Sequence, residues 1–281
     1  MLKKLKHLNP WHLFLALLLI ALAFLWLMPL WFAVATSFKY EAEIYGETLT
    51  WIPKIPTLYN YEYVFSARAN IQILRWMLNS VFISGMHTLL LLFVDSLAAY
   101  AYARMQFRGR QSIFMALMAT MMIPGVINFI PNYVIVEKIG WLDTPTAMII
   151  PGLSGVFGIF LLRQFFLGIP KEIDESARID GAGNFTIYSR LILPLAKPAL
   201  LALAILTFMG SWNDYLWPLI VTNRDEAKTL TLGVALLFSR YNYQRGVILA
   251  GTCLAAVPPA LFFIFGQRYF VQGITFAAVK E

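Results

Sequence analysis

Two groups of polar residues lie inside stretches of sequence that are otherwise apolar. Asn128 and Asn132 are four residues apart between Pro124 and Pro131, so a helix would place both on one face. The second group is Trp212, Asn213, Asp214 and Tyr215. Polar side chains at membrane depth tend to face an interior or a wet cavity. Amides and carboxylates bind hydroxyl groups, and aromatic rings stack on C–H faces, which is the chemistry of a sugar pathway.

Each group also has a simpler interpretation. Tryptophan and tyrosine anchor helices at the membrane surface, and the neighbouring polar residues can cap a helix end there. The two asparagines can instead satisfy backbone groups that the prolines leave unpaired. The sequence leaves both interpretations open for both groups.

Asp95 is a carboxylate inside another apolar stretch. A lone acid of this kind is either a proton relay or a hydrogen-bonded contact between helices. The other apolar stretches show no matching basic residue or acid pair of the kind that a proton-coupled carrier needs, which favours the helix contact. Gly152, Gly155 and Gly158 recur every three residues and predict close helix packing.

Other chemistry is not indicated. His7, His12 and His87 lack a metal-ligand spacing, and the single Cys253 cannot form an internal disulfide. The sequence has no nucleophile–base pair, no cofactor motif and no G-x-x-x-x-G-K-[ST] phosphate loop. We therefore expect no catalytic residue, metal or cofactor in this chain. If ATP and Mg²⁺ are used, another polypeptide binds them.

The elements that carry these residues are predicted to span a membrane. The chain has 281 residues, of which 59% are hydrophobic and 13% charged. Six apolar stretches are long enough to span, at about 12–36, 76–103, 112–136, 145–167, 199–221 and 246–266. The first is too long for a signal peptide, so we expect a retained span. The prediction is one all-α membrane domain over residues 1–281.

Basic residues predict the orientation of the spans. With six spans the two termini share one side, and most of the 22 Lys and Arg residues fall on that side. Its short loop 104–110 holds three arginines and no acid, so this side should be cytoplasmic. The net charge of +7 is explained by this topology and by anionic lipid, without nucleic acid.

A polar segment of nearly thirty residues, 170–198, separates the fourth and fifth spans. Pro170 suits a first helical position, and Gly181 suits a left-handed C-terminal cap. Asn184 is placed to cap a second short helix, which should end near Pro194. These signals predict a helix–turn–helix outside the bilayer. A helix lying on lipid is the alternative, but the acids of the segment would then face anionic lipid.

The same segment resembles the EAA loop of ABC importer permeases. The family pattern reads EAA, three residues, Gly, nine residues, Ile, any residue, Leu-Pro; here Glu175-Ser176-Ala177 leads to Gly181, Leu191 and Leu193-Pro194. The six-span layout, Trp212-Asn213-Asp214 and the tail from Tyr269 to Lys280 resemble the carbohydrate-uptake members. Among these, the chain is most similar to the smaller permease of the maltose type.

The resemblance implies a type I importer permease fold with a cytoplasmic coupling loop between spans four and five. It implies that Glu175, Ala177 and Gly181 form the core of the contact with an ATPase. The full expected coupling set is Glu172, Glu175, Ser176, Ala177, Arg178, Asp180, Gly181, Leu193 and Pro194. It also implies a bacterial or archaeal cytoplasmic membrane and two kinds of extrinsic partner. These are a dimeric ATPase in the cytoplasm and a solute-binding protein outside.

By the same resemblance, the chain pairs with a second permease, most often a different one, and loop 223–245 reaches toward the solute in its binding protein. The expected substrate is a di- or oligosaccharide, with glycerol phosphate compounds as an alternative. A binding protein carrying all the specificity would leave Trp212 to Tyr215 without contact to solute. An ion-coupled carrier that uses Asp95 is a second class of function.

Overall fold

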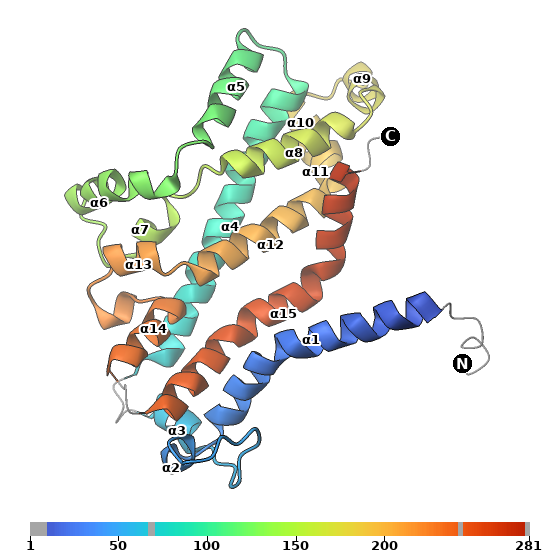
Figure 1. The fold of residues 1–281 in the computed structure, drawn as a ribbon. Helices are drawn as coiled ribbons and strands as arrows, with labels where there is room; N and C mark the ends of the chain where they lie inside the picture. Colours follow the sequence, from blue (N-terminus) through green and yellow to red (C-terminus); the bar gives the residue numbers. More distant parts are fainter. Residues whose placement is uncertain (1–9, 67–70, 241–243, 279–281) are drawn as a thin grey trace. The chain divides into compact units, whose positions relative to one another are not determined.

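The computed structural model describes residues 10–66, 71–240 and 244–278, and within these ranges the chain forms helices and no strand. It divides into two compact units, which are described separately. The first contains residues 1–71 and 236–254, and the second contains residues 72–235 and 255–281. Figure 1 follows the chain from blue to red.

The first unit contains α1 (Pro10–Ser37), α2 (Glu41–Ile44) and α3 (Tyr59–Phe65). The side chains of α1 are apolar and mostly exposed, as suits a helix in lipid. The loop after α1 is held by the buried Asn60, whose amide donates to the carbonyls of Ser37 and Lys39 at 2.9 and 2.8 Å.

The core of the second unit is built on three helices, α4 (Ile73–Arg104), α8 (Val156–Gly168) and α12 (Lys197–Asn213). Both α8 and α12 pack against α4 (Figure 1). Their shared core includes Leu91, Ala99, Leu162, Phe166, Ala199 and Leu203. Burial of this apolar surface fixes the three helices relative to one another.

Between α4 and α8 the chain forms α5 (Arg110–Thr120), η3 (Gly125–Asn128), α6 (Phe129–Lys138) and α7 (Pro145–Ile149). The direction changes by 91° between α5 and the helical stretch 125–138. The bend falls at Pro124, which cannot continue the backbone hydrogen bonding of a helix.

After α12 come α13 (Leu216–Val221), η5 (Asp225–Ala227), α14 (Leu230–Arg240) and α15 (Arg245–Ala278). The helix α12 ends at Asn213 because Asp214 adopts an extended backbone conformation, with φ −65° and ψ 123°. The predicted fifth span, 199–221, is therefore two helices, α12 and α13, rather than one.

The all-helical fold is confirmed, but the six spans do not appear as six long helices. Within the described ranges, three helices are long and apolar enough to cross a membrane, at 11–37, 73–104 and 245–267. Two bent pairs raise the number to at most five. The predicted fourth span is divided between α7 and the 13-residue α8. The six-span count stays a prediction.

Candidate functional site

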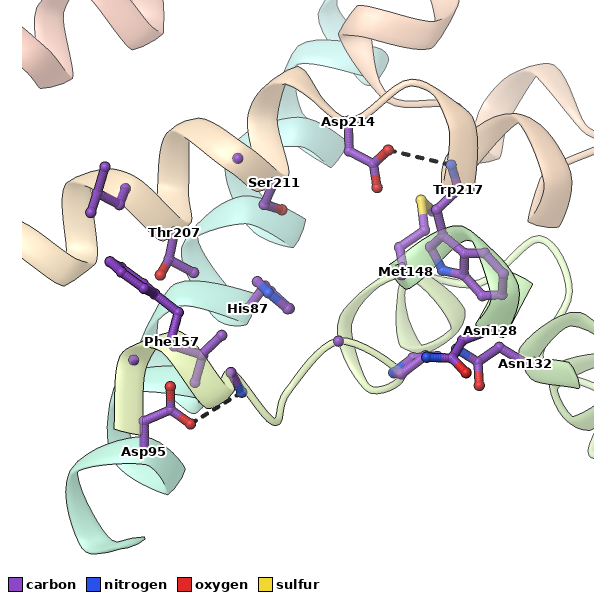
Figure 2. Close-up of a pocket in the computed structure, with 18 of the residues that line it drawn as sticks. His87, Asp95, Asn128, Asn132, Met148, Phe157, Thr207, Ser211, Asp214 and Trp217 are labelled. Atoms are coloured by element: carbon purple, nitrogen blue, oxygen red, sulfur yellow. Dashed lines mark hydrogen bonds between the residues drawn. The ribbon is translucent and has the colours of Figure 1, made fainter. Parts of the chain in front are cut away.

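A cavity of about 590 Å³ lies among α4, α8, α12, α13 and the η3–α6 region. Its polar lining comes from His87, Asp95, Asn128, Asn132, Thr207, Ser211 and Asp214. Phe129, Phe157, Met148 and Trp217 supply apolar surface. Figure 2 shows Thr207 and Ser211 of α12 on the side of that helix that faces His87. This mixture of hydroxyl, amide and aromatic groups suits a polyhydroxylated ligand.

At one end of the cavity, Asp214 organises the start of α13. Its carboxylate oxygen Oδ1 accepts a hydrogen bond from the Trp217 backbone N–H at 3.3 Å. The Trp217 indole N–H donates to the Ala147 carbonyl at 2.8 Å, which joins α13 to α7. The aromatic wall is therefore held by two hydrogen bonds as well as by packing against Phe129.

At the other end, Asp95 is fully buried and its Oδ1 accepts a hydrogen bond from the Gly155 N–H at 3.3 Å. His87 lies on the same helix, α4, and its Nδ1 is 3.0 Å from the Ile149 carbonyl. The helix contact predicted for Asp95 is therefore present. The close packing predicted from Gly152, Gly155 and Gly158 is present too, since these glycines make room for His87 and Asp95.

The six residues predicted to line a solute pathway separate into two groups. Asn128, Asn132 and Asp214 line the cavity. Trp212, Asn213 and Tyr215 do not appear in its lining. Trp212 is 1% exposed, stacks on Phe208 and donates to the Ala255 carbonyl at 3.2 Å. The Asn213 amide donates back to the Met209 carbonyl at 2.8 Å, so it caps its own helix.

Several lining residues were not singled out from the sequence. His87 was noted without a role, and Thr207, Ser211, Phe157 and Trp217 carried no signal of their own. The helical periodicity of residues 203–211 does predict some of these lining residues. Leu203, Thr207 and Ser211 recur every four residues and therefore share one face of α12.

The 170–198 segment contains a helix, a glycine turn and a second helix. The first is α9 (Glu172–Ile179), and α10 (Asn184–Ile187) begins the second. Gly181 has φ 82°, the Gly181 N–H donates to the Arg178 carbonyl and the Ala182 N–H to the Ala177 carbonyl. This is the left-handed C-cap predicted for Gly181.

Two details of the prediction for this segment were wrong. The helix α9 starts at Glu172 with Lys171 as N-cap, so Pro170 lies outside it. Gly183 is the N-cap of α10, because its extended backbone takes the position predicted for Asn184. The helix end predicted near Pro194 is confirmed, since the second helix stops at Leu195. Before that it passes through a π-helical turn, Tyr188–Ile192, into α11 (Leu193–Leu195), whose first turn accommodates the proline.

The predicted coupling residues mostly lie on the outer face of this segment. Those exposed are Glu172, Glu175, Ser176, Arg178, Asp180, Gly181 and Pro194. Ala177 and Leu193 are partly buried against the core of the second unit. Two large apolar side chains also project outward, Ile179 at 87% exposure and Phe185 at 70%. Arg178 joins the two helices by donating to Asn184 Oδ1 at 2.8 Å.

The long apolar helices define a membrane protein, its cavity is lined by both polar and apolar groups, and the comparisons specify the family. Residues 96–275 match the model of the binding-protein-dependent transport system inner membrane component. The chain belongs to this family of ABC transporter permease subunits, which are not themselves enzymes. It is a multi-pass inner-membrane component of such a system.

Two curated relatives cover nearly the whole chain. The arabinooligosaccharides transport system permease protein AraQ of Halalkalibacterium halodurans is 37% identical over 92% of this chain and 93% of its own length. The trehalose/maltose transport system permease protein MalG of Thermococcus litoralis is 30% identical over 93% of this chain and 94% of its own.

The fold matches a solved transporter. A bacterial ABC transporter involved in the import of the acidic polysaccharide alginate has a chain that aligns with a TM-score of 0.81. The alignment covers 92% of this chain and 96% of that one at 24% identity. At this identity the likeness establishes the fold of the chain.

Proposed function

We propose that this chain is one permease of an ATP-driven importer that carries a neutral di- or oligosaccharide into the cytoplasm. The observation that carries the proposal is the 590 Å³ cavity, whose hydroxyl, amide and aromatic groups converge from helices of one packed core. A cavity of this size and lining suits one or two sugar rings. The relatives named for arabino-oligosaccharides and for trehalose and maltose support the same substrate class.

The charges of the cavity favour a neutral sugar over an anionic one. Its described lining contains two carboxylates, Asp95 and Asp214, and no lysine or arginine. A phosphate or uronate group would lie close to negative charge without a cationic partner. This argues against glycerol phosphate compounds. It also argues against acidic polysaccharide, although the solved relative by fold is named for alginate import.

The 170–198 segment serves as the docking site for the ATPase. An exposed helix pair that presents Ile179 and Phe185 among charged residues is the kind of surface that a protein groove covers. The contact set is Glu172, Glu175, Ser176, Ala177, Arg178, Asp180, Gly181, Leu193 and Pro194. Movement of the two bound ATPases would then reach the spans as a rigid-body shift. ATP and Mg²⁺ are bound by that partner.

The assembly that follows has two permeases, two ATPase subunits and a solute-binding protein. Six spans, with both termini and the 170–198 segment in the cytoplasm, place the ATPases and the binding protein on opposite sides. A second, different permease completes the pathway. A solved transporter of the same fold, in complex with an alginate-bound periplasmic protein, supports the binding-protein partner.

One experiment tests this function directly. The chain is purified in mild detergent from its native membrane, co-purifying proteins are identified, and the assembly is reconstituted in vesicles. We expect a second permease, an ATPase and a binding protein. Uptake of labelled arabino-oligosaccharide, maltose or trehalose should require ATP. Uptake of glycerol 3-phosphate or an alginate pentasaccharide in preference to these would contradict the neutral-sugar proposal.

The alternative of an ion-coupled carrier makes the opposite prediction. Such a carrier would move solute in vesicles that contain this chain alone, driven by a proton or sodium gradient without ATP. ATP-dependent uptake that is insensitive to such gradients excludes it.

A further inference from the structure

A single arginine joins the ends of three helices at the base of the 170–198 segment. Arg104 is the last residue of α4, and its Nη2 donates to the Phe166 and Ile169 carbonyls, each at 2.6 Å. These carbonyls lie at the C-terminus of α8, where a cation is stabilised by the helix dipole. The other terminal nitrogen, Nη1, is 3.6 Å from Asp174 Oδ2 in the first turn of α9.

The ion pair is buried, unlike the other charged groups of α9. The Arg104 side chain is 3% exposed and the Asp174 side chain 10%, whereas Glu172, Glu175 and Arg178 are exposed. Charges are placed in such surroundings only with a partner, because an unpaired buried charge is strongly destabilising. Arg104, Asp174 and Arg178 line a second, polar cavity, but Arg178 instead donates to Asn184. Asp174 is thus held by Arg104 in particular.

Two of the three helices that Arg104 joins, α4 and α8, also line the sugar cavity. Asp95 and His87 lie on α4, and Phe157 and Gly158 lie on α8. Because α4 and α8 pack closely along their lengths, a displacement carried by Arg104 reaches the cavity through a rigid body. We propose that the buried Arg104–Asp174 ion pair is the positioning contact that links movement of α9 to the cavity-lining helices.

This inference rests on the proposed function, and it adds a residue outside the exposed docking surface. The distance of 3.6 Å is longer than a charge-assisted hydrogen bond, and both Asp174 Oδ1 and Arg104 Nε are buried without a hydrogen-bond partner. The contact therefore has room to tighten when α9 shifts toward α4. The tightened contact would be the second of the two discrete states that coupling requires.

Asp174→Asn is the decisive variant. It removes the charge at nearly constant shape, and Arg104 keeps both carbonyl contacts to α8, so its buried charge stays hydrogen-bonded and the exposed docking face is unaltered, at some cost in stability. In the reconstituted transporter, we expect the variant to bind the ATPase as the wild type does. The number of ATP molecules hydrolysed per sugar imported should rise at least about fivefold. Asp174→Glu retains the charge and should restore most of the coupling.

Glu137→Gln is the matched control, since it removes an exposed carboxylate at the end of α6 and should leave the ratio unchanged. Parallel loss of hydrolysis, import and assembly in Asp174→Asn would assign the pair a purely structural role and overturn the inference. An unchanged ATP-to-sugar ratio would overturn it as well. If the wild type itself imports without an ATPase, the proposed function fails instead, so the two failures are distinguishable.

Discussion

The carboxylate of Asp95 occupies the space in which residue 158 would place a side chain. A Cβ built on Gly158 overlaps Asp95 Oδ2 and lies 3.0 Å from the Leu203 side chain. A Cβ on Gly155 would be 2.8 Å from the same oxygen. The approach of α8 to α4 and the burial of this acid therefore depend on each other.

Gly158→Ala should destabilise the protein by about 1–3 kcal/mol, because the added methyl group must displace the buried carboxylate. Thermal unfolding in detergent measures the loss. Gly168→Ala is the control on the same helix, since no heavy atom lies within 4 Å of its Cβ position. Asp95→Ala in the Gly158→Ala background should recover part of the loss. Additive effects of the two substitutions would contradict the overlap.

Asp95→Asn tests whether this carboxylate carries protons. Asn retains the shape and can still accept the hydrogen bond from Gly155 N–H through its amide oxygen. If Asp95 is a helix contact, ATP-driven uptake should persist with the same dependence on external pH. The measurement is the initial uptake rate across a pH series in wild type and variant. Loss of uptake together with loss of its pH dependence would support the relay instead.

The sequence predicts the local features of this fold better than the pairings between helices. The Gly181 cap follows from local turn chemistry and is confirmed by its φ of 82°. The prediction that Asn184 caps the second helix was wrong, because the preceding residue, Gly183, occupies the N-cap position. Its backbone is extended there, and no side-chain hydrogen bond caps the helix. The helix end near Pro194 is confirmed, since the helix stops at Leu195, and the proline is tolerated because it lies in the first turn of α11.

The sequence also predicts only part of the cavity lining, because some of the lining residues come together only when helices pack. Asn128, Asn132 and Asp214 were identifiable because polar side chains are costly in an apolar segment. His87 and Thr207 became neighbours only when α4 and α12 packed, and nothing in their own segments specifies that pairing. Trp212, by contrast, was predicted to line the pathway but lies outside the cavity lining. Its type suggested sugar stacking, but its ring is packed against Phe208 in the core.

Two substitutions of Gly181 should distinguish the effect of backbone strain at this turn from the effect of blocking the docking of the ATPase. No heavy atom lies within 4 Å of a Cβ built there, so the turn has space and only its φ of 82° disfavours a side chain. Gly181→Ala should cost about 1–2 kcal/mol and retain coupling. Gly181→Trp adds bulk to the exposed docking face, so the protein should reach the membrane while solute no longer stimulates ATP hydrolysis. Normal stimulation in this variant would contradict the docking assignment.

The loop after α1 should respond to acid through Glu43. Its carboxylate accepts hydrogen bonds from Thr50 Oγ1 at 2.8 Å and from the Lys54 N–H at 3.0 and 3.2 Å. Desolvation opposes ionisation, but these hydrogen bonds and the charges of Lys39 and Lys54 hold the pKa of Glu43 below its usual value.

Because the pKa of Glu43 is lower in the folded protein than in the unfolded chain, the ionised carboxylate stabilises the fold at pH values above its unfolded pKa. This stabilisation is lost as the pH falls through the folded pKa. Hydrogen exchange of the Lys54 amide, corrected for its intrinsic pH dependence, should therefore accelerate on acidification. In Glu43→Gln the corrected exchange should be fast and independent of pH. Protection that persists in acid would show that the carboxylate does not hold this loop.

Gly233→Ala should release the loop that follows α13. A Cβ on Gly233 overlaps the Trp76 ring and lies 2.6 Å from its Cζ3 atom. That ring donates its N–H to the Asp225 carbonyl at 2.7 Å, and Asn79 donates to the Glu226 and Lys228 carbonyls at 2.8 and 2.9 Å. Displacing Trp76 therefore removes one of these three hydrogen bonds to residues 225–228, the start of the segment expected to face the binding protein.

We expect Gly233→Ala to assemble with its partners but to bind the solute-loaded binding protein more weakly, because an unanchored loop must be ordered again on contact. The affinity is measured by titrating binding protein onto the transporter in lipid nanodiscs. Gly85→Ala on α4, with no heavy atom within 4 Å of its Cβ position, is the matched control and should bind normally. Unchanged affinity in Gly233→Ala would place the binding-protein contact elsewhere on the chain.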